Sequence, residues 1–330
     1  MAFISGRHVN AWSIKEAIRQ LSCDLDGWCF FTEESSLLAA IGEHQGKCRF
    51  KPQMSAELID DKWAFHEWLS SIGEHPVPSW VSADQISSYP VILKSRHSWR
   101  DAKKLPRGWC CSDEGQMLHK YNSLDERGLR KEWFFFQAYL GDGALNVSVS
   151  GYYDFEHEHR RLTVTTRKVL GNDGDLPTGV VVEVIDDPAD LTERALGILR
   201  RLRYDGPFEM EFIMDPTRRD FLVLELNPRF WMQHGLFTRF ADNGLVKRYV
   251  DMDGDEDWRI RVISKRAVWV NSIDTLAGVV RGDFRILRLA LRYYADGAQV
   301  LFVPDWSVAS GHLLKRLARK VGLNVRLDLF

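Results

Sequence analysis

Two glutamates in adjacent apolar runs are the residues whose type and spacing best suit chemistry. Glu211 interrupts EMEFIMD and Glu225 interrupts FLVLELN, where a buried strand would favour hydrophobic side chains. Directly opposed carboxylates repel each other by roughly several tenths of a kcal/mol, and a cation between them would remove that cost. With the amide oxygen of Asn227 they form a set of hard oxygen ligands that suits Mg²⁺ bridging phosphate groups.

An antiparallel hairpin is predicted to hold these acids, with strands from Phe208 to Met214 and from Phe221 to Pro228 around a turn centred near Arg218. Side chains alternate between the faces of a strand, so one face collects Glu209, Glu211, Glu225, Asn227 and Arg229. The other face collects Phe208, Met210, Phe212, Met214, Leu222, Leu224 and Leu226. A structural alternative remains open, in which Arg229 or another base neutralises a buried pair of acids.

Two lysines stand where they could contact an anion. Lys94 ends the apolar run YPVILK and is followed by polar residues, which places its ammonium group at the end of a predicted strand. Lys62 opens a predicted helix directly after Asp60 and Asp61. Either lysine alone is more often a solvated side chain. Their order along the chain, followed by the acid hairpin, favours a shared site.

Alternation between periods of about two and about 3.6 residues predicts a mixed α and β protein. Residues 1–52 read as a small strand-and-helix unit. A helix from Asp60 to Gly73 begins at an acid and ends at a glycine, and a buried strand follows from Tyr89 to Ser95. The elements predicted before the hairpin are an apolar strand after Trp133, strands around 145–155, 160–170 and 180–185, and an amphipathic helix over 187–204.

The composition is that of an ordinary globular protein, with 330 residues, 45% of them hydrophobic, and 44 Lys and Arg against 46 Asp and Glu. This balance gives no global attraction for nucleic acid, and no sequence-specific nucleic-acid motif is present. The five cysteines show no CxxC spacing, which is typical of unpaired thiols in a reducing compartment. With no transmembrane-length apolar run and no signal-peptide core, the expected location is cytoplasmic.

Several segments, in their order and separation, resemble the ATP-grasp superfamily. They are DDKWAFHEWLSSIG, YPVILKS, FFFQAYLGDG, RKVLGNDGDLPTG, GPFEMEFIMD and VLELNPRFW, which span roughly residues 60–235. The resemblance implies an α+β and α/β fold in which two α+β lobes grip a nucleotide. It divides the chain into a short α/β N-terminal unit (1–60), an ATP-grasp catalytic domain (61–240) and a basic helical C-terminal region for a substrate or partner (241–330).

The resemblance also implies roles for particular residues. It makes Glu211, Glu225 and Asn227 the ligands of Mg²⁺ or Mn²⁺ beside ATP. The implied phosphate-binding and catalytic residues are Lys62, Lys94, Arg229, and Lys168 or its neighbour Arg167, which would face the γ-phosphate and substrate. The implied adenine site is the hinge of Gln137, Ala138, Tyr139 and Leu140, whose backbone would read the base, flanked by Ile92 and Leu226.

Two departures from the family pattern bear on activity. Ala138 follows Gln137 where the family has an acid, although the adenine contact at that place is largely through the backbone. The stretch after Lys94 has no run of glycines to hold phosphates. The side chains that could replace them are Arg96, His97 and Arg100.

The C-terminal segment is locally basic, with 13 Lys and Arg against 5 Asp and Glu from Arg259 to Phe330. FRILRLALRYY and GHLLKRLARKVG predict basic amphipathic helices. These helices would pack their leucines on the catalytic lobes and leave their bases in water. Contact with an anionic or peptidic acceptor, a partner protein or, peripherally, anionic lipid also remains open.

The expected function is an ATP-dependent carboxylate–amine ligase that forms an amide or peptide bond through an acylphosphate and converts ATP to ADP and phosphate. Lysines, an arginine and a metal suit phosphoryl transfer, which needs charge neutralisation and alignment more than a covalent nucleophile. The expected partners are a small-molecule carboxylate and an amine, such as an amino acid or peptide, and a homo-oligomer is compatible. The alternatives are a small-molecule kinase on the same fold and a catalytically degenerate nucleotide-binding scaffold.

Overall fold

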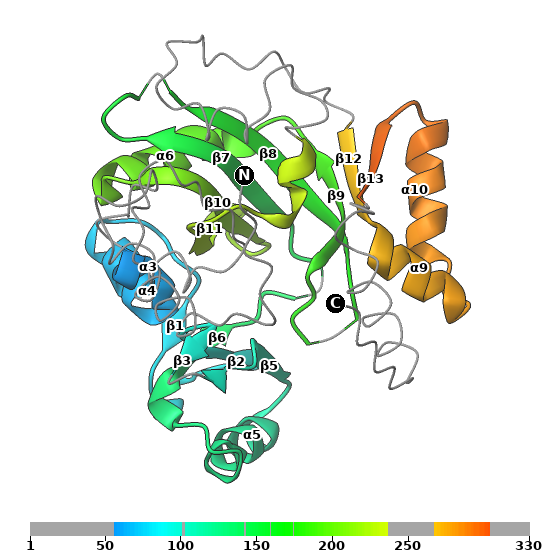
Figure 1. Cartoon of the computed structure of the whole chain (residues 1–330). Helices are drawn as coiled ribbons and strands as arrows, with labels where there is room; N and C mark the ends of the chain where they lie inside the picture. The colour runs from blue at the N-terminus through cyan, green and yellow to red at the C-terminus, as the bar shows by residue number, and fades with distance from the viewer. Residues whose placement is uncertain are drawn as a thin grey trace, which may run out of the picture.

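The computed structural model describes residues 56–100, 103–141, 143–158, 160–173, 175–236 and 267–303. Most of the predicted N-terminal unit and the second basic helix, around residues 311–322, lie outside the described residues. A four-stranded sheet and a seven-stranded sheet dominate the described part, and Figure 1 shows the smaller sheet below the larger one. No helix within the described ranges is long and apolar enough to cross a membrane.

The small sheet has the strand order β1-β6-β2-β5, and all its neighbouring strands are antiparallel. Its strands are β1 (Ser79–Trp80), β2 (Val91–Ser95), β5 (Gly108–Cys111) and β6 (Phe134–Ala138). A separate short hairpin, β3 (Trp99–Arg100) and β4 (Lys103–Lys104), lies between β2 and β5 along the chain. The predicted strands ending at Ser95 and following Trp133 are therefore confirmed as β2 and β6.

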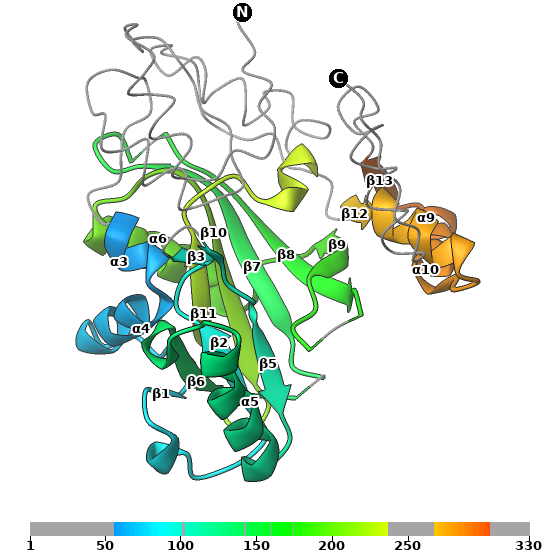
Figure 2. The ribbon, with the colours of Figure 1, turned by 60° about the horizontal axis from the view of Figure 1, so that its bottom comes forward.

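Helix α5 (Glu114–Glu126) covers one face of the small sheet, as Figure 2 shows. Its residues Met117 and Leu124 belong to the same buried core as Val91 and Leu93 of β2. Because successive side chains of a strand point to opposite faces, Lys94 is directed away from this core. The face of the small sheet that α5 leaves uncovered is the face that contributes to the site.

The large sheet has the order β11-β10-β7-β8-β9-β12-β13. Its strands are β7 (Asn146–Asp154), β8 (Leu162–Gly171), β9 (Gly179–Val184), β10 (Asp205–Asp215), β11 (Asp220–Asn227), β12 (Ala267–Asn271) and β13 (Gln299–Val303). Neighbouring strands are antiparallel except β12 and β13, which are parallel. Four elements that had been predicted from periodicity alone, β7, β8, β9 and the hairpin β10–β11, are thus confirmed.

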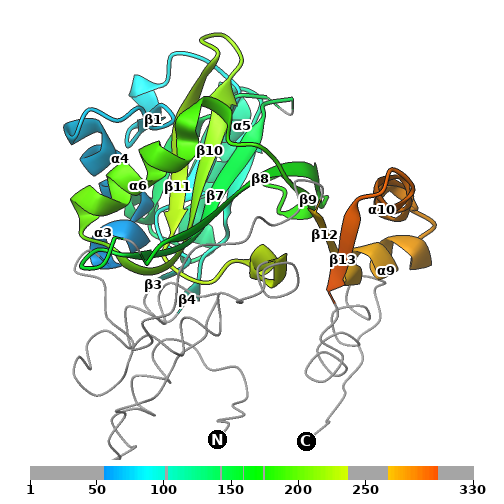
Figure 3. The same ribbon diagram turned by 90° about the horizontal axis from the view of Figure 1, so that it is seen from above.

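Helix α6 (Leu191–Leu202) packs on the face of the large sheet formed by β7, β10 and β11, as the view from above shows (Figure 3). Leu196 and Leu199 share a core with Phe208 and Phe212 of β10. The last turn of α6 carries Arg200 and Arg201, and positive charges are favourable at a helix C-terminus because of the helix dipole. This core occupies one face of the hairpin and leaves its opposite face to the acids.

The register of the hairpin brings the two acids together as the alternation predicts. Glu211 and Glu225 are direct cross-strand partners. A β-bulge after Glu211 then shifts the pairing, so that Phe212 faces Val223. The extra residue reverses the alternation of β11, and Phe221 and Val223 join the core. The prediction that Leu222 and Leu224 share the core face with Phe212 was therefore wrong.

The described part of the C-terminal region continues the large sheet. Strand β12 pairs with β9, and helices α9 (Ser272–Val280) and α10 (Arg285–Ala295) then lead to β13 on its other side (Figure 1). Helix α10 confirms the first predicted basic helix, and its Leu289 and Ala290 pack against Val268 and Val270 of β12. Residues 267–303 are thus joined to the preceding strands by a shared sheet.

Helix α4 (Lys62–Ser71) follows the five-residue helix α3 (Ala56–Asp60) and begins at Lys62 because Asp61 caps it. Asp61 Oδ1 accepts hydrogen bonds from the amides of Trp63 at 3.1 Å and Ala64 at 3.3 Å. The guanidinium of Arg96 also contacts both Asp61 oxygens, at 2.9 and 2.5 Å. Although burial raises the pKa of Asp61, the hydrogen bonds from Arg96 and Ala64 outweigh burial and lower it.

Replacing Asp61 with alanine is expected to lower the free energy of unfolding by about 1–2 kcal/mol, because α4 loses its cap and Arg96 loses its partner. Denaturant unfolding measures the loss. Asp113→Ala is the matched control, because Asp113 caps α5 in an exposed position and has no arginine partner of this kind. Equal losses in the two variants would contradict a contribution from Arg96.

Candidate functional site

The opposed glutamates lie where the two sheets meet. Lys94 reaches from β2 of the small sheet, and its Nζ is 3.0 Å from Glu225 Oε2 of the large sheet. The two side chains are only 10% and 13% exposed, so this ion pair is buried. The same Nζ donates to Gln137 Oε1 at 3.3 Å. A charged contact therefore crosses between the sheets at the predicted acid hairpin.

Asn227 and Arg229 extend the polar face of the hairpin. The Asn227 amide nitrogen donates to Glu209 Oε2 at 3.2 Å and to Glu211 Oε1 at 3.1 Å. The Asn227 oxygen accepts a hydrogen bond from Arg229 Nη2 at 3.4 Å. One amide thus links the arginine to two of the three buried glutamates.

The three glutamates titrate differently because their surroundings differ. Burial, with the neighbouring charge of Glu211, raises the pKa of Glu209 to about 8. Burial and the charge of Glu225 also raise the pKa of Glu211. Burial would raise the pKa of Glu225 too, but the charges of Lys94, Lys62 and Arg107 outweigh burial and lower it. The site therefore holds one carboxyl group with a lowered pKa and two with raised pKa values.

Lys62 of helix α4 and Lys168 of strand β8 both act on this group. Lys62 is the first residue of α4, where its amide donates to the Arg96 carbonyl at 3.0 Å, and its charge acts on Glu225. Lys168 lies on β8 of the large sheet, and its charge acts on Glu211. Its Nζ donates to the Pro177 carbonyl at 3.2 Å. The structure thus brings both predicted lysines near the acid pair.

Arg167 is placed differently from its neighbour Lys168. Its Nε donates to Glu183 Oε1 at 2.6 Å, and the other oxygen of Glu183 accepts from the Tyr293 hydroxyl at 2.6 Å. Tyr293 belongs to α10, so Arg167 lies toward the helices of the C-terminal region. Of the two basic residues that the sequence left open, Lys168 is the one whose charge reaches Glu211.

The predicted hinge, residues 137–140, lies at the end of β6 and contacts the site through Gln137, which accepts a hydrogen bond from Lys94. Gln137 is 3% exposed and donates to the Ser79 hydroxyl at 3.3 Å. The amides of Ala138 and Tyr139 donate to the carbonyls of Pro78 at 2.8 Å and Pro90 at 3.3 Å. Within the described residues, the Leu140 amide has no backbone acceptor. Leu140 is therefore the hinge residue whose N–H remains available to a ligand.

The two predicted apolar contacts of the base have different positions. Ile92 is half-buried and, by alternation, shares the face of β2 that carries Lys94. Leu226 is 4% exposed and lies in the core beneath α6, so placing it against the base was wrong. Because successive side chains of a strand point to opposite faces, Leu226 points away from the face that carries Glu225. The half-buried Ile213, two residues after Glu211, is a more suitable apolar residue on the acid face of β10.

Sequence reasoning missed Arg107, which directly precedes β5. Its charge acts on both Glu211 and Glu225, and its Nη1 donates to the Thr178 hydroxyl at 2.5 Å. Arg96 and His97, which were considered as replacements for a glycine-rich loop, contact Asp61 and Asp60. The only sequence signal for Arg107 was its position shortly after the strand that carries Lys94. Several other basic residues follow that strand, so this signal did not single out Arg107.

The donor set suits a divalent ion that also contacts phosphate. Among the described residues no group of three or more His, Cys, Asp or Glu side chains is placed to hold a metal ion alone. Glu211 and Glu225 supply two carboxylates, and turning the Asn227 amide by 180° would present its oxygen to them. The charge of Glu225 raises the pKa of its cross-strand partner Glu211, and a cation bound between the two carboxylates would offset that repulsion.

Parts of the chain are similar to known proteins. The family described as "Carbamoyl-phosphate synthase L chain, ATP binding domain" matches residues 185–250. The carbamoyl phosphate synthase large chain of Clostridium acetobutylicum is 23% identical over an alignment of 209 residues, and the match covers 57% of this chain and 18% of that protein. The chain therefore spans less than a fifth of the length of this curated relative.

Three solved structures share the fold. The biotin carboxylase domain of 2-oxoglutarate carboxylase from Hydrogenobacter thermophilus has a TM-score of 0.54 at 17% identity, covering 76% of this chain and 58% of that chain. Biotin carboxylase from Campylobacter jejuni has a TM-score of 0.54 at 17% identity, covering 78% and 59%. N5-carboxyaminoimidazole synthetase from Staphylococcus aureus has a TM-score of 0.53 at 18% identity, covering 72% and 62%. At these identities the likeness shows the fold.

Proposed function

We propose that this chain, which is an ATP-grasp protein, binds Mg²⁺ and ATP between its two sheets and uses them to join a carboxylate to an amine. The observation that carries the proposal is the buried contact between Lys94 and Glu225, which places a cation from one sheet against an opposed acid pair on the other. The solved Hydrogenobacter domain is in complex with MgADP and bicarbonate and the Staphylococcus enzyme is in complex with ADP, which supports the choice of ligand.

When bound, Mg²⁺ and ATP supply the phosphoryl group that converts a carboxylate into an acylphosphate, and an amine then displaces the phosphate. Glu211, Glu225 and Asn227 would hold the ion. Lys94, Lys62 and Arg107 would neutralise phosphate oxygens, since their charges already reach Glu225. Leu140 offers its free amide to the base.

Two further residues suit the acceptor half of the reaction. Arg229 is half-buried and lies two residues from Asn227 on the polar face of the hairpin, so its guanidinium can orient a carboxylate close to the ion. Glu209, with its pKa raised to about 8, can exchange a proton near neutral pH. It is therefore a candidate to receive the proton that the amine loses on attack.

Replacing Glu225 with glutamine is expected to weaken the Mg²⁺-dependent binding of a non-hydrolysable ATP analogue by about tenfold or more, because one metal ligand is lost. Calorimetric titration with and without Mg²⁺ measures the change. Glu158→Gln is the control, because Glu158 forms an exposed pair with Arg200 away from the site. Absence of metal-dependent binding in the unmodified protein would overturn the proposal.

Product analysis separates a ligase from the alternatives. We expect phosphate release that requires both a carboxylate and an amine, and bicarbonate is the first carboxylate to screen because it is bound in the Hydrogenobacter structure. A phosphorylated product that persists without an amine would identify a kinase instead. Nucleotide binding without turnover across the screen would favour a degenerate scaffold.

A further inference from the structure

The connection between β8 and β9 contacts two cations of the candidate site. Pro177 O accepts from Lys168 Nζ at 3.2 Å. Thr178 Oγ1 and Leu176 O accept from Arg107 Nη1, at 2.5 and 3.5 Å. One short stretch of the large sheet thus holds a lysine of its own sheet and an arginine that arrives from the small sheet.

The base of this connection is closed by hydrogen bonds. The Thr178 amide donates to Asn172 Oδ1 at 2.8 Å, and the Asn172 amide donates to the Thr178 carbonyl at 2.9 Å. A side chain at Gly171 would place its Cβ 2.6 Å from Pro177 Cβ, so the approach of Pro177 requires glycine there. Lys168 and Arg107 therefore meet a connection whose start and end are fixed to each other.

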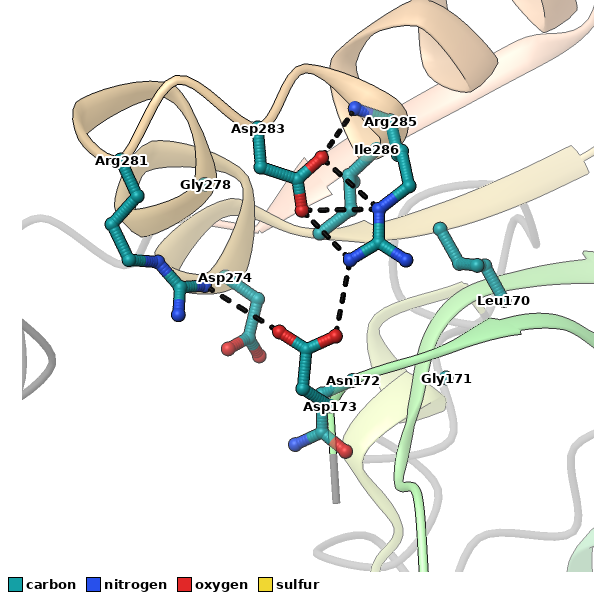
Figure 4. Close-up of a pocket in the computed structure, with 10 residues that line it drawn as sticks. All are labelled: Leu170, Gly171, Asn172, Asp173, Asp274, Gly278, Arg281, Asp283, Arg285 and Ile286. Carbon is teal, nitrogen blue, oxygen red and sulfur yellow. Dashed lines mark hydrogen bonds and ion pairs between the residues drawn. The ribbon is translucent and has the colours of Figure 1, made fainter.

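The start of the connection is tied to the C-terminal helices. Asp173 Oδ1 is 3.0 Å from Arg285 Nη2, and Asp173 Oδ2 is 3.9 Å from Arg281 Nη2. Arg285 also pairs with Asp283 at 2.8 Å. Figure 4 shows Asp173 directed at both arginines. These three residues help to line a cavity of about 120 Å³. These pairs are exposed, so each contributes little alone, but they join α9, α10 and the connection in one network.

The contacts with Lys168 and Arg107 orient these side chains without using up their hydrogen-bonding capacity. A lysine ammonium has three donors and an arginine guanidinium five, so each cation keeps free donors after bonding the connection. Both cations also act on the acid pair, Lys168 on Glu211 and Arg107 on Glu211 and Glu225. The connection thus positions Lys168 and Arg107 and leaves some of their N–H groups free to bind an anion.

We propose that Asp173 is a positioning residue that, through Arg281 and Arg285, anchors the β8–β9 connection and so fixes Lys168 and Arg107 beside the acid pair. The inference rests on the proposed function for the identity of the ligand, the phosphates of a Mg²⁺-bound nucleotide. It gives the α9–α10 unit a part in the site although it supplies no ligand. Preorganised cations bind an anion more tightly than mobile ones because less conformational freedom is lost on binding.

The test uses the full chain and the variant Asp173→Asn, which keeps the shape of the side chain and removes its charge. Hydrogen exchange measured without nucleotide is expected to rise by about threefold or more in the peptide over residues 175–179. Calorimetric affinity for the Mg²⁺-bound ATP analogue is expected to fall by about three- to tenfold. Asp173→Glu, which restores the carboxylate, is expected to recover both values at least in part.

Asp296→Asn is the matched control. Asp296 lies 3.9 Å from Arg292 in an exposed pair at the end of α10, the helix that begins at Arg285. Both readouts should stay at their unmodified values in this variant. A change as large as that of Asp173→Asn would mean that losing any carboxylate that pairs with an arginine of α10 has the same effect, and would overturn the proposal.

The two readouts also separate this inference from the proposed function. Unchanged exchange in Asp173→Asn would overturn the anchoring, whatever the nucleotide result. Increased exchange with unchanged or tighter nucleotide binding would overturn the positioning of the cations. If the unmodified protein binds no nucleotide, the proposed function fails, and the exchange comparison still decides whether Asp173 anchors the connection.

Discussion

Replacing Lys94 with methionine is expected to destabilise the folded protein by about 3–5 kcal/mol at pH 8, because it leaves the carboxylate of Glu225 buried without its closest partner. The side chains of Lys94 and Glu225 are 10% and 13% exposed, so water cannot replace the ammonium group. Methionine has a similar length and no charge, which limits the change to the lost ion pair and the lost hydrogen bond to Gln137. Denaturant unfolding measures the loss.

Two controls separate the lost charge from the lost packing. The double variant Lys94→Met with Glu225→Gln should recover much of the stability, because no unpaired charge is then buried. Lys131→Met removes a lysine whose pair with Asp125 is 35% and 65% exposed, and it should cost less than about 1 kcal/mol. The Lys94→Met deficit should also shrink at pH 5, where a Glu225 without its lysine takes up a proton. A deficit equal to that of Lys131→Met would contradict the buried pair.

The ligand-free protein is expected to lose stability, on the order of a few kcal/mol, as the pH rises from about 4.5 to about 8. The pKa of Glu209 is raised to about 8 in the folded state from an ordinary 4.5. Between these values the unfolded chain releases a proton that the folded state keeps, so rising pH favours unfolding. Below 4.5 both states are protonated, and above 8 the full cost is present.

Unfolding midpoints at pH 6 and pH 9 measure this dependence. Glu209→Gln should flatten it, because glutamine cannot titrate, and Mg²⁺ should reduce it by stabilising the ionised acids. Glu225 does not counteract the effect in this range, since its lowered pKa confines its contribution to pH values below 4.5. An unmodified protein as stable at pH 9 as at pH 6 would show that the acids are not desolvated as described.

The acid hairpin could be predicted because its information is local. Alternation, a polar turn and two misplaced acids specify which residues share a face, and the partners Glu211 and Glu225 follow from the position of the turn. The bulge after Glu211 could not be predicted, since an unpaired extra residue leaves the hydrophobic pattern nearly unchanged. It moved Leu224 from the predicted core face, where Val223 lies instead.

Contacts between segments that are distant in the sequence could not be predicted from it. Arg96, His97 and Arg107 follow Lys94 within a short basic stretch and look alike as candidates. The structure separates them, because Asp61 captures Arg96 and Asp60 captures His97, whereas Arg107 faces the acid pair. Which arginine meets which acid depends on how α4, which packs in the core of the large sheet, meets the residues that follow β2, and residue type and spacing do not encode that.

The sheet that joins β9 to β12 has a consequence for the order in which the chain folds. Val181 and Val182 pair with Val270 and Trp269, residues that a ribosome adds much later. Until β12 arrives, β9 is an edge strand whose Val180, Val181 and Val182 have no outer neighbour, and such an edge is a template for aggregation. The same holds for a fragment that stops near residue 240. Strand β12 is thus synthesised late and protects the aggregation-prone edge of β9. Slow synthesis between β9 and β12 would prolong the exposure of that edge.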